Sequence, residues 1–315
     1  MSAGIQSVIS LAKESTWGTA VTPTKSIAVR PTGGIQIKTG MTIVPAVKGL
    51  LQKHYKAIKG KTSYDGDFTF DCFADYVGYF LLSALGTDTP ATHSGETIVY
   101  DHVYTETNPK PSLTIEQSIA ENCRRFAGYI VSGFKISAKV GEMIEFTPTG
   151  MAKTQATSTQ ITAAFSTVEP FNHAQAIVKI GGSTIGEVES FELDYKNGLD
   201  YVYALGNVEP AFASISGGSE VTGKVELYLD ATALTRLTNY LANTNEALEL
   251  VITGGAIGSA AAYVLDITIP KAVYTAVESK VTDAHNMLSI SFEGIYDTAT
   301  SKMIGVTLTN LLASY

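Results

Sequence analysis

The chain has 315 residues, of which 45% are hydrophobic and 17% are charged, with 28 glycines and two cysteines. This composition excludes a disordered or collagen-like chain, and two cysteines are too few for a disulfide framework. The net charge is −8, but residues 15–64 carry basic side chains and no acidic ones. Such segregation suggests contacts between complementary surfaces of neighbouring copies, or contact with a polyanion.

The N-terminal residues lack the basic region and apolar core of a signal peptide. The longest uncharged apolar stretch, between Glu249 and Asp266, is rich in glycine and shorter than the roughly 20 residues that a membrane-spanning helix needs. The abundance of Thr, Val, Ile and Tyr favours strands. We therefore expect a soluble, mainly β protein.

An alternating strand is predicted within residues 34–40, and the connection that follows it, 38–63, is too long for a tight hairpin loop. It carries apolar side chains that a solvated loop would not need. We expect a long basic arm that contacts a neighbouring subunit, with folding onto its own domain as the alternative. The candidate contact residues are Lys48, Leu50, Leu51, Lys53, Tyr55, Lys56 and Lys59.

Residues 64–86 change from a period of two to spacings of three and four, which predicts a strand followed by a short amphipathic helix. The same pattern recurs at 221–243, where Gly223 matches Gly66. The expected core residues are Val77, Phe80 and Ala84 in the first helix, and Leu234, Leu237 and Leu241 in the second.

The segment 87–112 has no counterpart in the second half and is interpreted as an extra loop. Its histidines and carboxylates could bind a metal, but no ligand spacing repeats, so we expect a charged, solvated loop with no metal and no cofactor. The residues concerned are Asp88, His93, Glu96, Asp101, His102 and Glu106.

Three further blocks match in the same order, and together they indicate an internal repeat. The pairs of blocks are 34–40 with 190–198, 113–117 with 248–252, and 142–150 with 286–294. We predict two tandem homologous β-barrel or sandwich domains, residues 1–155 and 156–315, each with one short flanking helix. The second domain has its own arm at 196–220, with Tyr201, Tyr203 and Phe212 as candidate contact residues.

No catalytic motif of the hydrolase, zinc-protease, Walker or dinucleotide-binding type occurs, so we do not expect an enzyme. Sequence-specific DNA binding is disfavoured because such proteins are normally basic overall. Another structural or adhesive β protein remains the alternative.

Several phrases resemble siphophage major tail tube proteins, and the resemblance covers nearly the whole chain. They are AKESTWGTAVTPT (Ala12–Thr24), YDGDFTFD, KPSLTIEQ and VESFELDYKNGLDYVYALGNVEP (Val188–Pro210). The resemblance implies that three copies of the duplicated chain close a pseudo-hexameric ring, and that rings stack into a hollow tube through which phage DNA passes during ejection. A tube-like baseplate or distal tail ring is the alternative.

The resemblance also implies partners: a tape-measure protein in the lumen, a tail terminator, and distal tail or baseplate proteins. It implies assembly in the host cytoplasm and a final place in the virion tail.

An acidic or neutral lumen would let DNA slide, because DNA carries a dense phosphate charge. The candidate lumen charges are Asp71, Glu187, Glu189, Glu192 and Asp194.

Overall fold

The computed structural model describes residues 8–45, 49, 51, 54–119, 122–281 and 285–315, and it is mainly β with two α-helices, as predicted. The first strands are β1 (Val8–Lys13), β2 (Lys25–Ile27), β3 (Val29–Gly33), β4 (Gln36–Pro45), β5 (His54–Asp71), β6 (Gly86–Thr92), β7 (Tyr100–Glu106), β8 (Leu113–Ile119), β9 (Asn122–Lys139), β10 (Glu145–Ala152) and β11 (Thr154–Thr157). The later strands are β12 (Ala176–Ile180), β13 (Ser183–Ile185), β14 (Val188–Lys196), β15 (Leu199–Val202), β16 (Phe212–Ile215), β17 (Glu220–Tyr228), β18 (Glu246–Ile257), β19 (Ala261–Val281), β20 (Asn286–Gly294) and β21 (Gly305–Asn310). The helices are α1 (Val77–Leu85) and α2 (Ala231–Leu241), with a short 3-10 turn, η2 (His173–Gln175).

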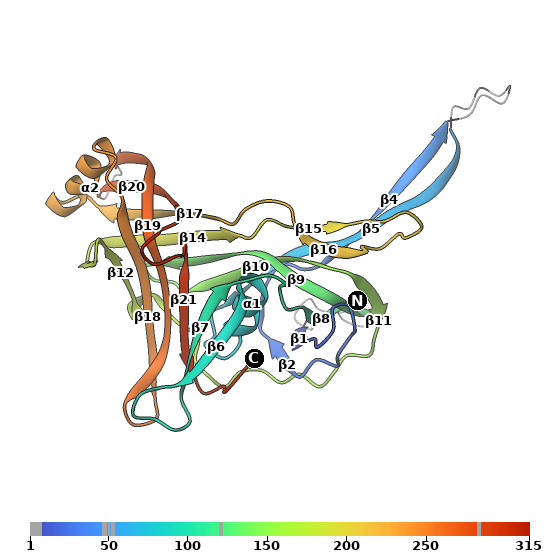
Figure 1. The fold of residues 1–315 in the computed structure, drawn as a ribbon, viewed down its shortest axis with the longest axis horizontal. Helices are drawn as coiled ribbons and strands as arrows, with labels where there is room; N and C mark the ends of the chain where they lie inside the picture. The colour runs from blue at the N-terminus through green and yellow to red at the C-terminus, as the bar shows by residue number, and fades with distance from the viewer. Residues whose placement is uncertain (1–7, 46–48, 50, 52–53, 120–121, 282–284) are drawn as a thin grey trace.

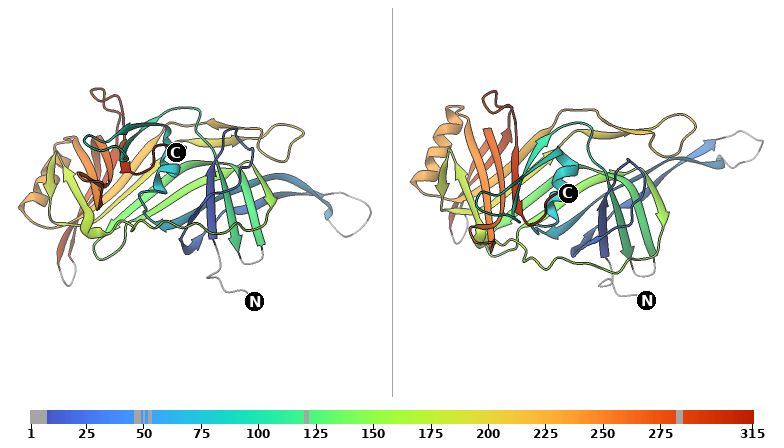
Figure 2. Two further views of the ribbon diagram at one scale, coloured as in Figure 1. Left: turned by 90° about the horizontal axis from the view of Figure 1, so that it is seen from below. Right: turned by 60° about the horizontal axis from the view of Figure 1, so that its bottom comes forward.

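One antiparallel sheet runs through both halves of the chain in the order β4–β5–β10–β9–β14–β17–β20–β19 (Figures 1 and 2). The two halves meet where β9 pairs with β14, from Ser190 opposite Lys139 to Lys196 opposite Gly133. Backbone hydrogen bonds therefore join the two halves directly, and the sheet continues from one half into the other without a break.

The same strand pairings occur in each half and in the same chain order. The pairs β1–β8, β8–β9, β9–β10, β10–β5 and β5–β4 of the first half have as counterparts β12–β18, β18–β19, β19–β20, β20–β17 and β17–β14. Both halves also have a β-bulge in the β9–β10 or β19–β20 pair. Just beyond that bulge, Gly150 lies opposite Gly66, and Phe292 lies opposite Gly223.

This register makes Phe292 the counterpart of Gly150, whereas the sequence blocks align Gly150 with Gly294, two residues further on. The difference has a simple physical origin. Alternating strands have a period of two, so a shift of two residues leaves every side chain on its own face and matches equally well in sequence.

Large aromatic side chains fill the core on one face of the sheet and connect the two halves. The Phe70 and Phe146 rings lie 5.5 Å apart, and Phe146 stacks on Phe134 at 5.3 Å. Phe134 in turn lies 5.2 Å from Tyr195, which belongs to β14 in the second half. The apolar core is therefore continuous across the β9–β14 junction.

Helix α1 is buried against this core. Val77, Phe80 and Ala84 are fully buried, and the Phe80 ring lies within 6.3 Å of three other phenylalanine rings. Gly78 is required where Tyr315 packs on the helix, because a Cβ at this position would come within 2.1 Å of the tyrosine ring. Residues at opposite ends of the sequence thus complete one packing unit.

The prediction for the core face of α2 is wrong at two of its three positions. Leu234 and Leu241 are 49% and 77% exposed, and only Leu237 is half-buried. The buried residues are instead Ala233 and Arg236, whose guanidinium pairs with Glu246 at the start of β18. The helix is rotated by one residue, about 100°, from the expected orientation, since an ion pair and a small side chain take the contact face.

The segment predicted as a solvated loop, 87–112, is largely a β-hairpin. Strands β6 and β7 pair with each other, and β7 pairs with β21 from the other end of the sequence. His102 is fully buried there, and its two ring nitrogens lie 2.8 Å from Asp88 and from the carbonyl oxygen of Leu312. Most other residues of this segment are exposed, so it is a charged, solvated hairpin and not a loop, and the pairing with β21 buries only a few side chains such as His102.

Candidate assembly surfaces

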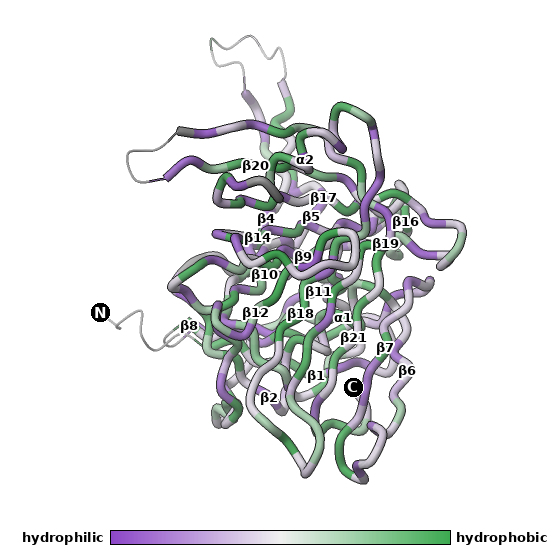
Figure 3. Tube along the Cα trace, turned by 90° about the vertical axis from the view of Figure 1, so that its left-hand side faces the viewer, coloured by the Kyte–Doolittle hydropathy of each residue, from purple (hydrophilic) through white to green (hydrophobic). Residues whose placement is uncertain are grey.

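The sheet has one polar face, opposite the aromatic core. Hydropathy alternates along its strands (Figure 3). Since successive side chains of a strand point to opposite faces, every second side chain lies on this face, and these are mostly polar. Thr69 and Thr147 share a hydrogen bond of 2.9 Å on this face. Acidic residues outnumber basic ones on it. The acids include Asp65, Asp67, Asp71, Glu145, Glu192, Asp194, Glu220, Glu226, Glu278 and Glu293, and the bases include Arg30, Lys38, Lys135, Lys139, Lys196, Lys224 and Lys280.

Three of the candidate lumen charges therefore share one face: Asp71, Glu192 and Asp194. The other two lie at one end of β14. Glu189 accepts a hydrogen bond from the Tyr228 hydroxyl, and Glu187 is exposed just before the strand begins.

Ion pairs cross the strands of the polar face. Lys135 of β9 lies 2.8 Å from Glu192 of β14, and Lys224 and Lys280 lie 2.7 and 2.9 Å from Glu226. The hydrogen bonds from these two lysines lower the pKa of Glu226 to about 2. Most of the acidic charge on the middle of the face is thereby locally compensated, which gives a polar surface with a modest negative excess.

The first arm is a long β-hairpin made by β4 and the first part of β5, and it extends away from the body of the molecule (Figure 1). Leu51, Tyr55, Lys56 and Lys59 are all exposed on it. Other large apolar side chains are exposed beside them: Met41, Ile43 and Ile58. The remaining candidates, Lys48, Leu50 and Lys53, lie outside the described residues.

The base of the second arm packs on the first half of the same chain, whereas its tip, residues 204–208, is exposed. Tyr201 is only 6% exposed, and its hydroxyl donates to the carbonyl oxygens of Gly128 and Met151 at 2.5 and 2.6 Å. The Tyr203 hydroxyl donates to the carbonyl of Thr62 at 3.0 Å. The expectation that Tyr201 contacts a neighbouring subunit is therefore wrong: its buried hydroxyl is better satisfied within the chain.

Phe212 is the one second-arm candidate that stays open to solvent, at 52% exposure. It lies in β16, which pairs with β15 to form a small separate sheet.

Two residues that hold these surfaces in place were not singled out from the sequence. The carboxylate of Glu14, 5% exposed, accepts hydrogen bonds from the Ser112 and Thr114 hydroxyls and from two backbone amides. Asn197, also buried, donates to the carbonyl oxygens of Ala84 and Val131 and so fixes the start of the second arm to α1. The sequence pointed to neither role; it showed only that Glu14 is the last acidic residue before fifty residues without one.

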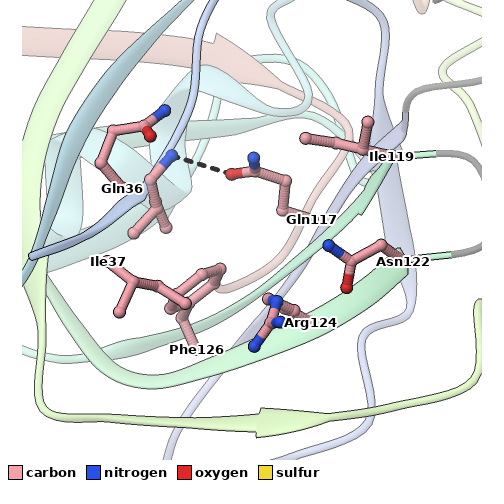
Figure 4. A pocket seen from close by; sticks show the side chains of 8 residues that line it. Gln36, Ile37, Gln117, Ile119, Asn122, Arg124 and Phe126 are labelled. Carbon is pink, nitrogen blue, oxygen red and sulfur yellow. Dashed lines mark hydrogen bonds between the residues drawn. The ribbon is translucent and has the colours of Figure 1, made fainter.

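A pocket of about 280 Å³ lies at the outer edge of β4, between it and the ends of β8 and β9 (Figure 4). The Gln117 side chain accepts a hydrogen bond of 2.8 Å from the backbone amide of Ile35 in its wall. The lining residues are Ile35, Gln36, Ile37, Gln117, Ile119, Asn122, Arg124 and Phe126. It mixes apolar, amide and guanidinium groups without a nucleophile or an acid–base pair.

Within the described part of the chain, no group of three or more His, Cys, Asp or Glu side chains is placed to hold a metal ion. Over the same residues, no helix is long and apolar enough to cross a membrane.

What the structure does present is a continuous sheet with one polar face, an open sheet edge and a projecting hairpin. These features define a structural β protein whose surfaces suit contact with other protein chains.

The chain belongs to the phage tail tube protein family, because the sequence model of that family matches residues 4–294. A comparison with the curated proteins found no match. The family is a structural one and not a family of enzymes. Membership places the chain in the tail of a virion, as a subunit that assembles with copies of itself into a tube.

Proposed function

We propose that three copies of this chain close a ring in which two homologous halves, residues 1–155 and 156–315, occupy pseudo-equivalent positions, and that such rings stack into the tail tube of a siphophage. The recurrence of five strand pairings in the two halves carries this proposal. A chain with two copies of one unit needs half as many subunits to close the same ring.

Each copy would contribute the eight strands from β4 to β19 to one closed barrel around the lumen. Barrels of about 16–18 strands already enclose a water-filled channel, and three copies of eight strands exceed that number. Closure would also leave no open sheet edge, which otherwise invites non-specific pairing.

The polar face of the sheet would line this channel, because the opposite face is occupied by the aromatic core. Its partly compensated acidic charge, with Asp71, Glu192 and Asp194 among the acids, suits the passage of double-stranded DNA. Phosphates would find few unpaired cations to bind. The tape-measure protein would occupy the same channel before ejection, and assembly would take place in the host cytoplasm.

The first arm would contact the next ring in the stack. Its side chains Met41, Ile43, Leu51 and Ile58 are exposed large apolar groups, and Lys56 and Lys59 are exposed among them. Repetition of one such head-to-tail contact along an axis gives an open filament. Terminator and distal tail proteins would cap the two ends of this filament.

Negative-stain electron microscopy of the purified, concentrated protein tests the proposal. We expect hollow tubes or rings whose end views show threefold or pseudo-sixfold symmetry. Particles that remain single chains at every concentration would contradict it. Rings that never stack would favour the alternative role, a distal tail or baseplate ring.

The role of the arm is tested by Lys56→Glu combined with Lys59→Glu. Both side chains are exposed, so the isolated chain should melt as the wild type does. Rings should still form, but tubes should not, because reversed charges would face the neighbouring ring. Lys302→Glu, an exposed lysine on the body, serves as the control and should leave tubes intact. Normal tubes from the double variant would refute the role of the arm.

A further inference from the structure

We propose that neighbouring copies in the ring join by pairing β4 of one copy with residues 276–280 of β19 of the next, with Gln36 directly opposite Glu278. This inference rests on the proposed function and specifies its lateral interface residue by residue. The contact is an extension of the antiparallel sheet from one chain into the next.

The argument starts from the junction inside the chain, where β9 pairs with β14. In the pairing scheme that recurs in the two halves, β9 corresponds to β19 and β14 corresponds to β4. The internal junction is therefore a β19-type strand of one unit against a β4-type strand of the next. The same contact between separate chains joins β19 to β4.

Both strands have an open edge at the required place. In the described part of the chain, β4 pairs with β5 alone. The partners of β19 are β18 and β21 up to Ala272, and beyond that residue only β20 pairs with it. One side of residues 275–281 is therefore free, as is the outer side of β4.

The two bulges and the glycine positions fix the register. Gly66 and Gly223 are counterparts, so Asp194 opposite Thr222 corresponds to Gln36 opposite Asp65. Across the other bulge, Lys135 faces Thr147, three residues before Gly150, and Glu278 faces Ser289, three residues before Phe292. Because Phe292 is the counterpart of Gly150, Lys135 corresponds to Glu278. Since Asp194 lies opposite Lys135 inside the chain, Gln36 lies opposite Glu278 between chains.

The chemistry of the two edges agrees with this register. Ile37, 41% exposed in the free chain, would meet the half-buried Val277, in the places that Tyr195 and Phe134 occupy in the internal junction. On the polar face, Lys38 would be a diagonal neighbour of Glu278, in the places that Lys196 and Lys135 occupy in the internal junction, so that opposite charges replace two like ones. The exposed isoleucine gains an apolar partner, and Glu278, whose charge already acts on Lys280, gains a second lysine that in the free chain pairs with Asp65.

The backbone directions also agree. Gly34 donates its amide to Asp67 of β5, so the amide of Ile35 points away from β5, and it does so toward Gln117. Alternation sends the amide of Ile37 outward as well, toward the next copy. Gln36 and Glu278 then form a non-hydrogen-bonded pair, in which the Cα atoms lie about 4.5 Å apart.

Cysteine cross-linking tests the register. In the double variant Gln36→Cys, Glu278→Cys, assembled and then oxidised, we expect disulfide-linked dimers and trimers on a non-reducing gel. A Cα separation of about 4.5 Å lies within the range of a disulfide. The control Gln36→Cys, Val277→Cys is one residue out of register and places the thiols on opposite faces. The two single variants control for the native thiols, Cys72 and Cys123, both of which are buried.

The outcomes separate this inference from the function on which it rests. Tubes from the double variant with no more cross-linking than the out-of-register control would overturn the register while leaving the tube in place. Cross-linking at least about tenfold above the control supports it, as the distance argument requires. A wild-type protein that forms no rings or tubes overturns the proposed function, and this inference falls with it.

A proline at Ile37 gives a second test that does not depend on oxidation. Proline removes an amide hydrogen that points away from β5, and edge strands tolerate this change. Ile37→Pro should fold and melt like the control Ile37→Val but should fail to close rings. Normal ring closure by Ile37→Pro would overturn the pairing.

Discussion

Replacing Phe80 with alanine should remove a large part of the stability of the whole molecule. The side chain is fully buried, with ring centroids 5.7, 5.4 and 6.2 Å from Phe68, Phe70 and Phe146. Truncation of a buried phenylalanine costs about 3–5 kcal/mol. The three ring contacts place this site near the upper end, because aromatic pairs add about 0.5–1.5 kcal/mol each beyond area burial.

The loss should appear as a single melting transition lowered by roughly 10–20 °C, from a loss of about 5 kcal/mol at about 2–4 °C per kcal/mol. Circular dichroism melts of the monomeric protein measure it. One transition is expected because the sheet and core are continuous between the halves. The matched control is Leu241→Ala on the exposed face of α2, which should stay within about 0.5 kcal/mol of wild type. Equal melting of the two variants, or separate melting of one half, would refute this reasoning.

Three further changes test polar contacts. Lysine partners Lys224 and Lys280 lower the pKa of Glu226 to about 2, so its stabilisation is complete above its ordinary pKa of 4.5 and is lost as the pH falls toward 2. The melting difference between wild type and Glu226→Gln should therefore shrink over that range, and a difference independent of pH would contradict the assignment. Glu14→Ala leaves the buried donors around this carboxylate unpaired, at a cost of about 1–3 kcal/mol each. Urea unfolding should therefore show a free energy of unfolding lower by several kcal/mol. A decrease below about 1 kcal/mol would contradict the role of these hydrogen bonds. Tyr201→Phe removes two hydrogen bonds to backbone carbonyls, costing about 1 kcal/mol, and should speed limited proteolysis of the second arm; unchanged cleavage would mean that packing alone holds it.

The mainly β class and the two helices could be predicted from periodicity, because periods of two and of three to four residues follow directly from backbone geometry. The burial of Phe80 followed from the same pattern. For α2 the pattern gave the wrong face. The ion pair between Arg236 and Glu246, and not the hydrophobic stripe, determines which side of that helix touches the body.

Long-range pairing explains the other differences. Nothing near His102 in sequence indicates that β21 will lie beside it. Likewise, Tyr201 is an aromatic residue in a long connection, and only the fold shows that its hydroxyl meets carbonyls of Gly128 and Met151. The sequence showed that Glu192 and Asp194, two residues apart in one strand, point to the same face of the sheet. Which face this is depends on the register of β14 with β9 and β17.

The packing of Tyr315 on Gly78 has a consequence for how the chain is made. Helix α1 is synthesised early, yet the ring that covers it belongs to a residue 237 positions later. At about 5–20 residues per second, the ribosome needs roughly 10–50 s to cover that distance. During this interval the side of α1 formed by Gly78 and Tyr79 lacks the ring that covers it. The packing of the first half is therefore complete only after the second half has been synthesised.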